Sequence, residues 1–397
     1  MLKSLLHLRH QHNLPTFVAF VDLVKAYDTT NHGLLIEILK RYGAPPKICS
    51  AIERMYLDFL VVIKIGKEKM EIPQTIGVRQ GDNLSLVLFI LLMSAFAECL
   101  ETEWGRNGIE KAEFSRVSTE SFENLEGQLV GHNLKMGFAD GVIFNILQIL
   151  YIDDGAFIFN SRKDLIKGVN LINDTFKKFG LEMHIGRNGK ASKTECIFFP
   201  PPGYFNQRAL EPVNANPLLS GPGEPYVSAG TPCTSDLMVL TQKTKQRKKK
   251  KLFRQSAKDI REDHLYDTHP ETQKGLVEDG YVEFAKHFCY LGSYVSYNLK
   301  DDYDISQRIT KASQNMGMLK NIWNCEHIDL HSKHLYFVAI IINQLLWGCE
   351  SWALKESSLN GLDIFLHQSI RRIMGIKMEQ VKEERLSNES LRKRFYN

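Results

Sequence analysis

The sequence predicts an α+β fold in which helices cover one face of an antiparallel sheet. The first half of the chain gives two of the observations that support this fold, the kind of segments it contains and the order in which they follow. Short apolar runs of strand length lie between amphipathic helical segments, and they follow the order strand, helices, hairpin, helix, hairpin, helix, strand from residue 17 to 199. A third observation is the composition, because 397 residues with 43% hydrophobic and 24% charged side chains are typical of folded domains and exclude wholesale disorder.

The first predicted strand runs from Phe17 to Leu23, because these residues are apolar or β-branched, and it carries Asp22 near its end. Asn31 is a plausible N-cap for the helix that follows. The next expected elements, in chain order, are a helix over 33–42, a helix that two prolines open at 45–46, a hairpin of 61–65 and 70–76, and a long helix over 83–104.

Two further apolar runs, 140–150 and 155–159, flank the tetrapeptide Tyr151-Ile152-Asp153-Asp154. The dipeptide Asp154-Gly155 is a strong signal for a tight hairpin turn. The sequence therefore predicts a hairpin with two acids at its tip. A helix over 163–179, ended by Gly180, and a strand over 193–199 complete this part of the chain.

We divide the chain into 1–199, the α+β part; 200–283, an insertion or linker rich in Pro, Gly, Asn and Ser; and 284–397. The last part begins with a strand or hairpin over 288–295. Helices over 304–323, 330–347 and 355–373 should follow it. The apolar run from 337 to 347 is too short to span a bilayer, so we expect a buried helix and no membrane partner.

Charge and cysteine usage limit the classes of protein. Fifty basic and forty-six acidic residues give +4, and nine Lys or Arg without an acid lie between Lys243 and Lys258. The run 243–251 fits a solvated loop, a contact to template phosphates or a nuclear-import signal. Seven widely spaced cysteines without a CxxC pair argue against a disulfide framework or zinc ribbon. The amino end lacks the pattern of a secretion signal, so we expect an intracellular protein, nuclear or cytoplasmic.

Asp153 and Asp154 are the most informative pair for chemistry. Adjacent carboxylates repel each other, and a divalent cation would stabilise both in the ionised form. Asp22 adds a third carboxylate at the end of another apolar strand, where an unpaired charge is costly. Three such acids can hold two Mg²⁺ ions about 4 Å apart, as nucleotidyl transfer requires. A plain acidic β-turn remains the alternative on the spacing alone.

Several motifs in the same order resemble the reverse transcriptases of LINE-type non-LTR retrotransposons. The segment Phe20-Val21-Asp22-Leu23-Val24-Lys25-Ala26-Tyr27-Asp28 resembles motif A, Arg79-Gln80-Gly81-Asp82-Asn83-Leu84-Ser85 resembles motif B, and Tyr151-Ile152-Asp153-Asp154 resembles motif C. Gly180-Leu181-Glu182 through Lys193-Thr194-Glu195 is similar to motif D, and Phe288-Cys289-Tyr290-Leu291-Gly292 is similar to the primer-grip motif E. The later segment Leu346-Trp347-Gly348-Cys349-Glu350-Ser351-Trp352 resembles one often found after the thumb in these elements.

The resemblance implies a palm-type polymerase core followed by a helical thumb-like region. It implies RNA-directed DNA synthesis, with an RNA template, a DNA or RNA primer, deoxynucleoside triphosphates and two Mg²⁺ ions, for which Mn²⁺ can substitute. The catalytic and metal-binding residues would be Asp22, Asp153 and Asp154. Tyr27 would be the steric gate against a ribose 2′-hydroxyl, and Arg79, Gln80, Gly81 and Lys193 would contact the nucleotide.

Each of these residues also has an ordinary structural interpretation. Tyr27 alone fits a core aromatic, 79–81 a plain loop and Lys193 a solvated strand-edge lysine, with Lys190 close by as a competing lysine. The joint order of the motifs favours the functional interpretation. The segment Phe138-Ala139-Asp140-Gly141 imitates motif C but lacks the second acid.

Two departures from the family pattern leave alternatives open. Motif B lacks both prolines of the usual Pro-Leu-Ser-Pro and carries Asp82 instead. Only 21 residues precede Asp22, so the fingers segments are almost absent and an amino-terminally truncated fragment of a larger polyprotein is expected. A catalytically inactive relic that folds and binds RNA is the second hypothesis. A different two-metal nucleotidyl transferase, such as a cyclase, is the third, although it would not predict Tyr27 or Arg-Gln-Gly.

Overall fold

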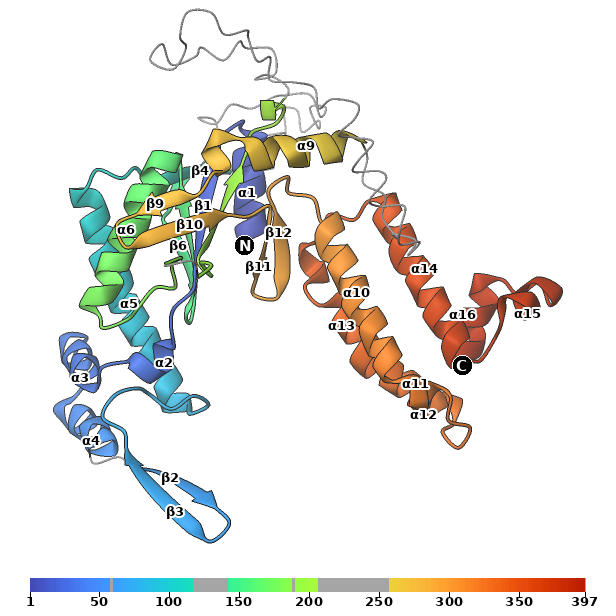
Figure 1. The fold of residues 1–397 in the computed structure, drawn as a ribbon, viewed down its shortest axis with the longest axis horizontal. Coiled ribbons are helices and arrows are strands. Elements are labelled where there is room, and N and C mark those ends of the chain that lie inside the picture. The colour runs from blue at the N-terminus through green and yellow to red at the C-terminus, as the bar shows by residue number, and fades with distance from the viewer. Residues whose placement is uncertain (58–59, 117–141, 188–189, 206–256, 397) are drawn as a thin grey trace, which may run out of the picture. The chain divides into compact units, whose positions relative to one another are not determined.

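The computed structural model describes residues 1–57, 60–116, 142–187, 190–205 and 257–396. These residues form two compact units (Figure 1). Unit 1 comprises 1–202 and 267–291, and unit 2 comprises 203–266 and 292–397. The segments Phe138 to Gly141 and Lys243 to Lys251, which the sequence singles out, lie outside the described residues.

Unit 1 is built on a six-stranded sheet with the strand order β6-β7-β1-β8-β10-β9. Strand β1 lies inside the sheet, antiparallel to β7 on one side and to β8 on the other. All six residues of β1 are buried, as its continuous apolar sequence predicts. The bounds are β1 Thr16–Val21, β6 Gln148–Tyr151, β7 Asp154–Phe159, β8 Glu195–Phe199, β9 Gly275–Val277 and β10 Gly280–Phe284.

Two long helices, α5 (Asn83–Arg106) and α6 (Arg162–Lys178), pack against each other, and α6 also packs against β1 and β7. The Phe96 and Phe176 rings stack with their centroids 3.9 Å apart. Gly168 on α6 permits this helix to lie close to β7, because a Cβ there would lie 2.1 Å from the Phe159 ring. The two helices and the sheet therefore share one aromatic core, which agrees with the predicted α+β class for this unit. The sheet is not wholly antiparallel as predicted, because β8 and β10 pair in parallel.

Helix α5 is the described helix that is long and apolar enough to cross a bilayer by length and composition, with a mean hydropathy of 2.0. Its buried side chains include Leu88, Leu92, Phe96 and Trp104. These residues contribute to the core of unit 1, whereas Leu86, Val87 and Ile90 of the same helix are exposed.

The remaining elements of unit 1 surround this sheet and its helices. Arg9 on the first helix is buried, and its guanidinium donates hydrogen bonds to Thr16 Oγ1, the carbonyls of Pro15 and Glu113, and Asn160 Oδ1. The bounds are α1 Leu2–Gln11, α2 Ala26–Thr29, α3 His32–Arg41, α4 Pro46–Tyr56, β2 Leu60–Ile65, β3 Glu68–Pro73, β4 Ala112–Arg116, β5 Val142–Ile146, η3 Pro270–Thr272 and β11 His287–Tyr290.

Unit 2 is mainly helical. Its core gathers apolar residues from α10, α11, η4, α13, α14 and α16, among them Ile305, Trp323, Phe337 and Phe365. The bounds are β12 Ser293–Ser296, α10 Asp302–Met318, α11 Lys320–Trp323, α12 Leu330–Tyr336, the π-helical turn η4 Phe337–Ile342, α13 Asn343–Leu346, η5 Cys349–Ser351, α14 Glu356–Ile373, α15 Met378–Glu383 and α16 Asn388–Tyr396. Helix α9 (Ala257–Thr268) begins in unit 2 and ends in unit 1.

The structure differs from the sequence predictions at four places. The described part of the run predicted over 140–150 forms two strands, β5 and β6, which belong to different sheets. Residues 257–283, assigned from sequence to the insertion, contain α9, β9 and β10, and the last two strands extend the sheet of unit 1. Segment 284–291, assigned with the carboxyl-terminal part, also belongs to unit 1. The helix predicted over 330–347 is only half buried, since Val338, Leu346 and Trp347 are exposed.

Candidate active site

Asp22 directly follows Val21, the last residue of β1, and so lies at the end of this strand beside β7. Side chains alternate along a strand, so Asp22 lies on the same face as Phe20, and Asp154 lies on the same face as Ala156. Phe20 and Ala156 are register partners. Phe17 and Phe159 are also partners, on the opposite face that α5 and α6 cover. The two carboxylates therefore share the face that the long helices leave open.

Asp153 and Asp154 lie at the β6–β7 hairpin, as predicted, but the turn is placed differently. Tyr151 pairs with Asp154, so Ile152 and Asp153 form the two-residue loop. Ile152 adopts the left-handed region with φ 58°, which is unusual for a β-branched residue. Gly155 lies inside β7, and a Cβ there would lie 2.8 Å from the Phe157 ring. The prediction of a turn at Asp154-Gly155 is therefore wrong, because this glycine provides space for a neighbouring ring.

The three acids place negative charge at this end of β1 and β7. Partial burial, and then the like charges of Asp153 and Asp22, raise the pKa of the Asp154 carboxyl. Within the described part of the chain, Asp153 and Asp154 make no side-chain hydrogen bond or ion pair. Asp22 and Asp154 line one cavity of about 310 Å³. The three acids thus lie in mutual electrostatic range, and protein groups leave Asp153 and Asp154 uncompensated.

Lys193 carries the positive charge nearest to these acids that the structure gives. Its Nζ lies 3.9 Å from Asp22 Oδ2, and its side chain is 69% exposed. Its backbone N–H donates to His184 Nδ1 at 3.3 Å, and the N–H of Asp22 donates to Thr194 Oγ1 at 3.2 Å. Among the described residues the Lys190 side chain forms no ion pair with these acids, and its carbonyl accepts from the hydroxyl of Tyr281. The geometry favours Lys193 over Lys190.

Tyr27 lies on the short helix α2, five residues after Asp22. Its ring stacks on Phe89 of α5 with the centroids 4.6 Å apart. Partial burial, and then the nearby charge of Asp153, raise the pKa of the Tyr27 hydroxyl. The ring is therefore fixed by α5 while the hydroxyl lies in the field of the hairpin acid.

The loop 77–82 approaches α2 through its backbone. The N–H of Val78 donates to the carbonyl of Tyr27 at 2.7 Å, and that of Gly77 donates to the carbonyl of Thr30 at 2.8 Å. A Cβ on Gly77 would lie 2.6 Å from the carbonyl oxygen of Asp28, so only glycine fits there. These contacts bring the segment that resembles motif B to the one that resembles motif A.

The three residues that the likeness to motif B predicts to contact the nucleotide come directly after Val78. Arg79, Gln80 and Gly81 are exposed, and Gly81 has φ 95°. Asp82, the unusual acid of this motif, is the N-cap of α5 and accepts from the N–H of Leu84 at 3.1 Å. The departure at Asp82 therefore has a structural role at a helix end, where a carboxylate is favourable.

Two further residues line the cavity, and the sequence placed each of them in a segment that resembles a family motif without giving it a role of its own. Tyr290 of β11 packs against Phe20 and donates from its hydroxyl to the carbonyl of Ile149; burial, and then Asp154, raise the pKa of Tyr290 to about 12. Glu195 of β8 is half-buried, and burial followed by the charge of Glu283 raises the pKa of its carboxyl. The alternation of Phe288 and Tyr290 in β11 was the available signal, since both rings contact Phe20.

The acids fit a divalent cation by charge and chemistry, because oxygen ligands with uncompensated negative charge are what Mg²⁺ prefers. Among the described residues, no three His, Cys, Asp or Glu side chains converge closely enough to enclose an ion as they stand. Asp22 and Asp154 share the cavity and Asp153 adds charge beside them.

Comparison with protein families gives a match for the first half of the chain. Residues 2–186 match the model described as reverse transcriptase (RNA-dependent DNA polymerase). This range includes Asp22, Tyr27, 79–81, Asp153 and Asp154. The fold of the matched part agrees with a palm-type polymerase core.

Three curated relatives carry retrotransposon names. The chain is 31% identical over 97 residues to the Pol polyprotein from type-2 retrotransposable element R2DM of Drosophila melanogaster, covering 24% of this chain and 9% of the relative. It is 33% identical over 87 residues to the Pol polyprotein from type-1 retrotransposable element R2 of Bradysia coprophila, covering 22% and 10%. The corresponding polyprotein of Nasonia vitripennis is 31% identical over 90 residues, covering 22% and 9%. The matched segment thus spans about a tenth of each relative.

Proposed function

We propose that this chain, whose residues 2–186 are a segment of the reverse transcriptase family, acts as the RNA-directed DNA polymerase domain of a LINE-type non-LTR retrotransposon. Its substrates would be an RNA template, a DNA or RNA primer and deoxynucleoside triphosphates. The observation that carries the proposal is the shared cavity of Asp22 and Asp154, next to which Asp153 adds uncompensated charge.

In this proposal Asp22, Asp153 and Asp154 hold the divalent cations. When bound, two Mg²⁺ ions, or Mn²⁺ in their place, would supply positive charge to the attacking and leaving oxygens of nucleotidyl transfer. The chain contributes the carboxylates, and Glu195 lines the same cavity as Asp22 and Asp154. The raised pKa of Asp154 supports this role, because the like charges that raise it are relieved when a cation binds.

Other side chains would orient the nucleotide. The Tyr27 ring, held against Phe89, would collide with a ribose 2′-hydroxyl and so select deoxynucleotides. Gly81 would let the backbone approach the nucleotide closely, with Arg79 and Gln80 exposed beside it. Lys193, exposed and near Asp22, would contact the triphosphate or give a proton to the leaving pyrophosphate.

The test is incorporation of labelled dTTP on poly(rA) primed with oligo(dT), with Mg²⁺ or Mn²⁺. The double variant Asp153→Asn/Asp154→Asn should lose activity by at least about 10³-fold, because residues that act as one catalytic unit fail together. The matched control is Glu383→Gln/Glu384→Gln, which removes the same two charges from adjacent exposed acids of α15. Equal activity in wild type and the hairpin variant would refute the site. An inactive wild-type chain that still binds RNA would favour the relic.

A further inference from the structure

The segment 182–187 connects the backbone of Asp22 to strand β10. On one side, the N–H of Val24 donates to the carbonyl of Glu182 at 2.8 Å, and the N–H of His184 donates to the carbonyl of Asp22 at 2.8 Å. On the other side, Gly186 exchanges two backbone hydrogen bonds with Tyr281, at 2.9 and 3.0 Å. The segment therefore acts as a short strand between the candidate catalytic residue and β10.

The same segment also reaches Lys193. The carbonyl of His184 accepts from the N–H of Thr194 at 3.0 Å and from Ser192 Oγ at 3.2 Å, and its ring accepts from the N–H of Lys193. His184 thus contacts the backbone of both Asp22 and Lys193. A displacement of this segment would move the two charged groups of the site together.

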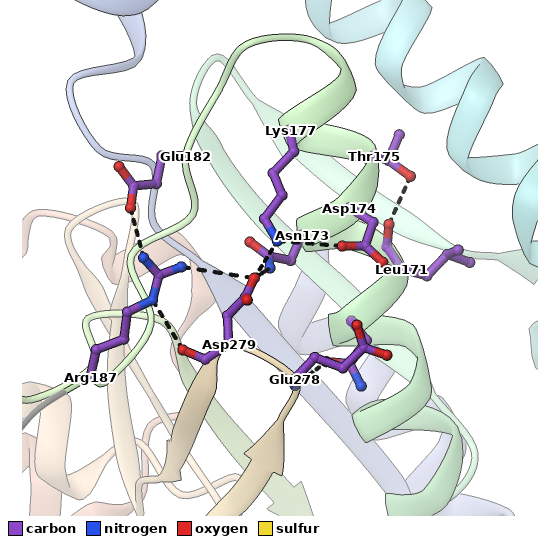
Figure 2. A network of polar contacts seen from close by, with 10 residues as sticks. Leu171, Asn173, Asp174, Thr175, Lys177, Glu182, Arg187, Glu278 and Asp279 are labelled. Atoms are coloured by element: carbon purple, nitrogen blue, oxygen red, sulfur yellow. Dashed lines mark hydrogen bonds and ion pairs between the residues drawn. The ribbon is translucent and has the colours of Figure 1, made fainter.

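Asp279, in the turn between β9 and β10, holds this segment in place (Figure 2). Its backbone carbonyl accepts from Arg187 Nε at 3.1 Å, and its carboxylate lies 3.9 Å from Arg187 Nη2. Arg187 Nη1 continues to Glu182 Oε1 at 3.1 Å. One arginine therefore links the β9–β10 turn to both ends of the segment.

The carboxylate of Asp279 is itself fixed by helix α6. Asn173 Nδ2 donates to Asp279 Oδ2 at 2.7 Å, and Lys177 forms an ion pair with the same oxygen. The adjacent N–H of Glu278 donates to Asn170 Oδ1 at 2.9 Å. The turn is thus attached to helix α6 of the core. Its contacts with Arg187 in turn fix the position of the Arg187 side chain.

The contact between segment 182–187 and strand β10 requires glycine at two positions. A Cβ on Gly186 would lie 2.4 Å from the ring of Tyr281, and a Cβ on Gly280 would lie 2.1 Å from the carbonyl oxygen of Gly186. Both distances are shorter than side chains permit. The close approach therefore depends on glycine at both positions, independently of the charged network.

We infer that Asp279 is a positioning residue, which through Arg187 and the segment 182–187 sets the place of Asp22 and Lys193 in the site. The inference rests on the proposed function, since it concerns the geometry of that same site. Asp279 and Gly280 lie beyond residue 186, outside the matched family segment. The part of the chain that follows the insertion thereby contributes to the catalytic geometry.

The first test measures backbone hydrogen exchange in the full chain and needs no activity. In Asp279→Ala, the amides of Val24, His184 and Gly186 should exchange about 10-fold faster or more, because the turn loses the carboxylate that attaches it to α6 and pairs with Arg187, while only the backbone carbonyl remains to bind Arg187. The amides of β1 should keep their protection. Asp174→Ala is the matched control, since Asp174 also pairs with Lys177 but has no contact with Arg187. Unchanged exchange in Asp279→Ala would overturn the inference, whether or not the wild-type chain is active.

The second test measures kinetics of dTTP incorporation. Asp279→Ala should lower kcat about 10-fold, since small displacements of catalytic groups are costly, while KM for dTTP changes less than about 2-fold. Asp279→Glu, which keeps the carboxylate, should recover most of kcat. An unchanged kcat in an active protein would overturn the inference. Inactive wild type with faster exchange in Asp279→Ala would refute the proposed function alone and support the positioning role.

Discussion

The two units use aspartate in opposite ways. In unit 2, Asp304 is fully buried and its carboxylate is satisfied: Oδ1 accepts from the N–H of Tyr294 at 3.1 Å and Oδ2 from Trp352 Nε1 at 2.9 Å. Arg308, 3% exposed, lies beside it with Nε 3.7 Å from Oδ1. In unit 1, Asp153 and Asp154 have no such partner among the described residues, and like charges surround Asp154.

The difference separates structural from functional carboxylates. A buried charge that collects donors stabilises one arrangement of the chain around it. A group of acids without donors destabilises its own edge of the sheet, which is a common property of sites that bind a cation. The late segment 346–352, which resembles a family motif, supplies a donor to a structural carboxylate, because its Trp352 donates to Asp304. The next residue, Ala353, donates from its N–H to Asp301 Oδ2 at 2.7 Å.

The largest effect is expected from Asp304→Ala, which tests the structural side of the comparison. The variant leaves Arg308 buried without this partner and removes the acceptor of Trp352, so the free energy of unfolding of unit 2 should fall by about 3–5 kcal/mol. Urea denaturation followed by tryptophan fluorescence measures it. Glu326→Gln, on an exposed turn, should stay within about 0.5 kcal/mol. A loss below about 1 kcal/mol would show that the network contributes little.

A smaller effect is expected from replacing Tyr27, the aromatic residue of unit 1 that we compare with Trp352 of unit 2. The Trp352 N–H is used by Asp304, whereas the Tyr27 hydroxyl makes no hydrogen bond with a described residue. Tyr27→Val should therefore raise incorporation of rUTP relative to dTTP by about 10- to 100-fold, because the ring that excludes the 2′-hydroxyl is gone. Tyr27→Phe keeps the ring and should keep the selectivity. A ratio unaltered by Tyr27→Val would assign Tyr27 to packing alone.

The smallest effect concerns the pH dependence of stability without metal. The folded protein raises the pKa of Asp154 above its unfolded value, so the group favours folding at low pH, and this contribution is lost as the pH rises through the folded pKa. Asp154→Asn should therefore be more stable than wild type at pH 7, by about 0.5 kcal/mol after solvent screening.

The corresponding measurement is the difference in thermal unfolding between the two proteins across pH. It should be near zero below the ordinary pKa of an aspartate and should grow toward neutral pH. Added Mg²⁺ should stabilise wild type and reverse the order at pH 7. A constant difference across the whole range would contradict the like-charge explanation.

The sequence predicted the elements that local signals define. The apolar run 17–23 is β1 followed by Asp22, Asn31 accepts from the N–H of Leu34 as an N-cap, and Gly180 follows α6 with φ 72°. These features depend on residues close together in the chain, so their patterns are visible without a structure. The order of motifs and the family were also accessible, because they need residue types and spacing only.

Contacts between distant segments were not accessible in this way. Nothing local in 257–283 indicates that β9 and β10 complete the sheet that β1 begins, since that pairing joins residues on either side of a long insertion. Likewise, Gly155 has the sequence of a turn, and only its pairing with Val21 of β1 and Leu150 of β6 places it in a strand.

The sequence by itself thus predicted the order of the elements of the α+β core, the likeness to reverse transcriptases and the three acids as a candidate site. The tertiary structure decided which of these acids share a cavity, that Lys193 rather than Lys190 lies near Asp22, and that Asp279 is attached to the same site. The physical reason is that residue types and periodicity are local properties of a chain. Charge repulsion, close backbone approach and hydrogen bonds between segments exist only after the chain has folded.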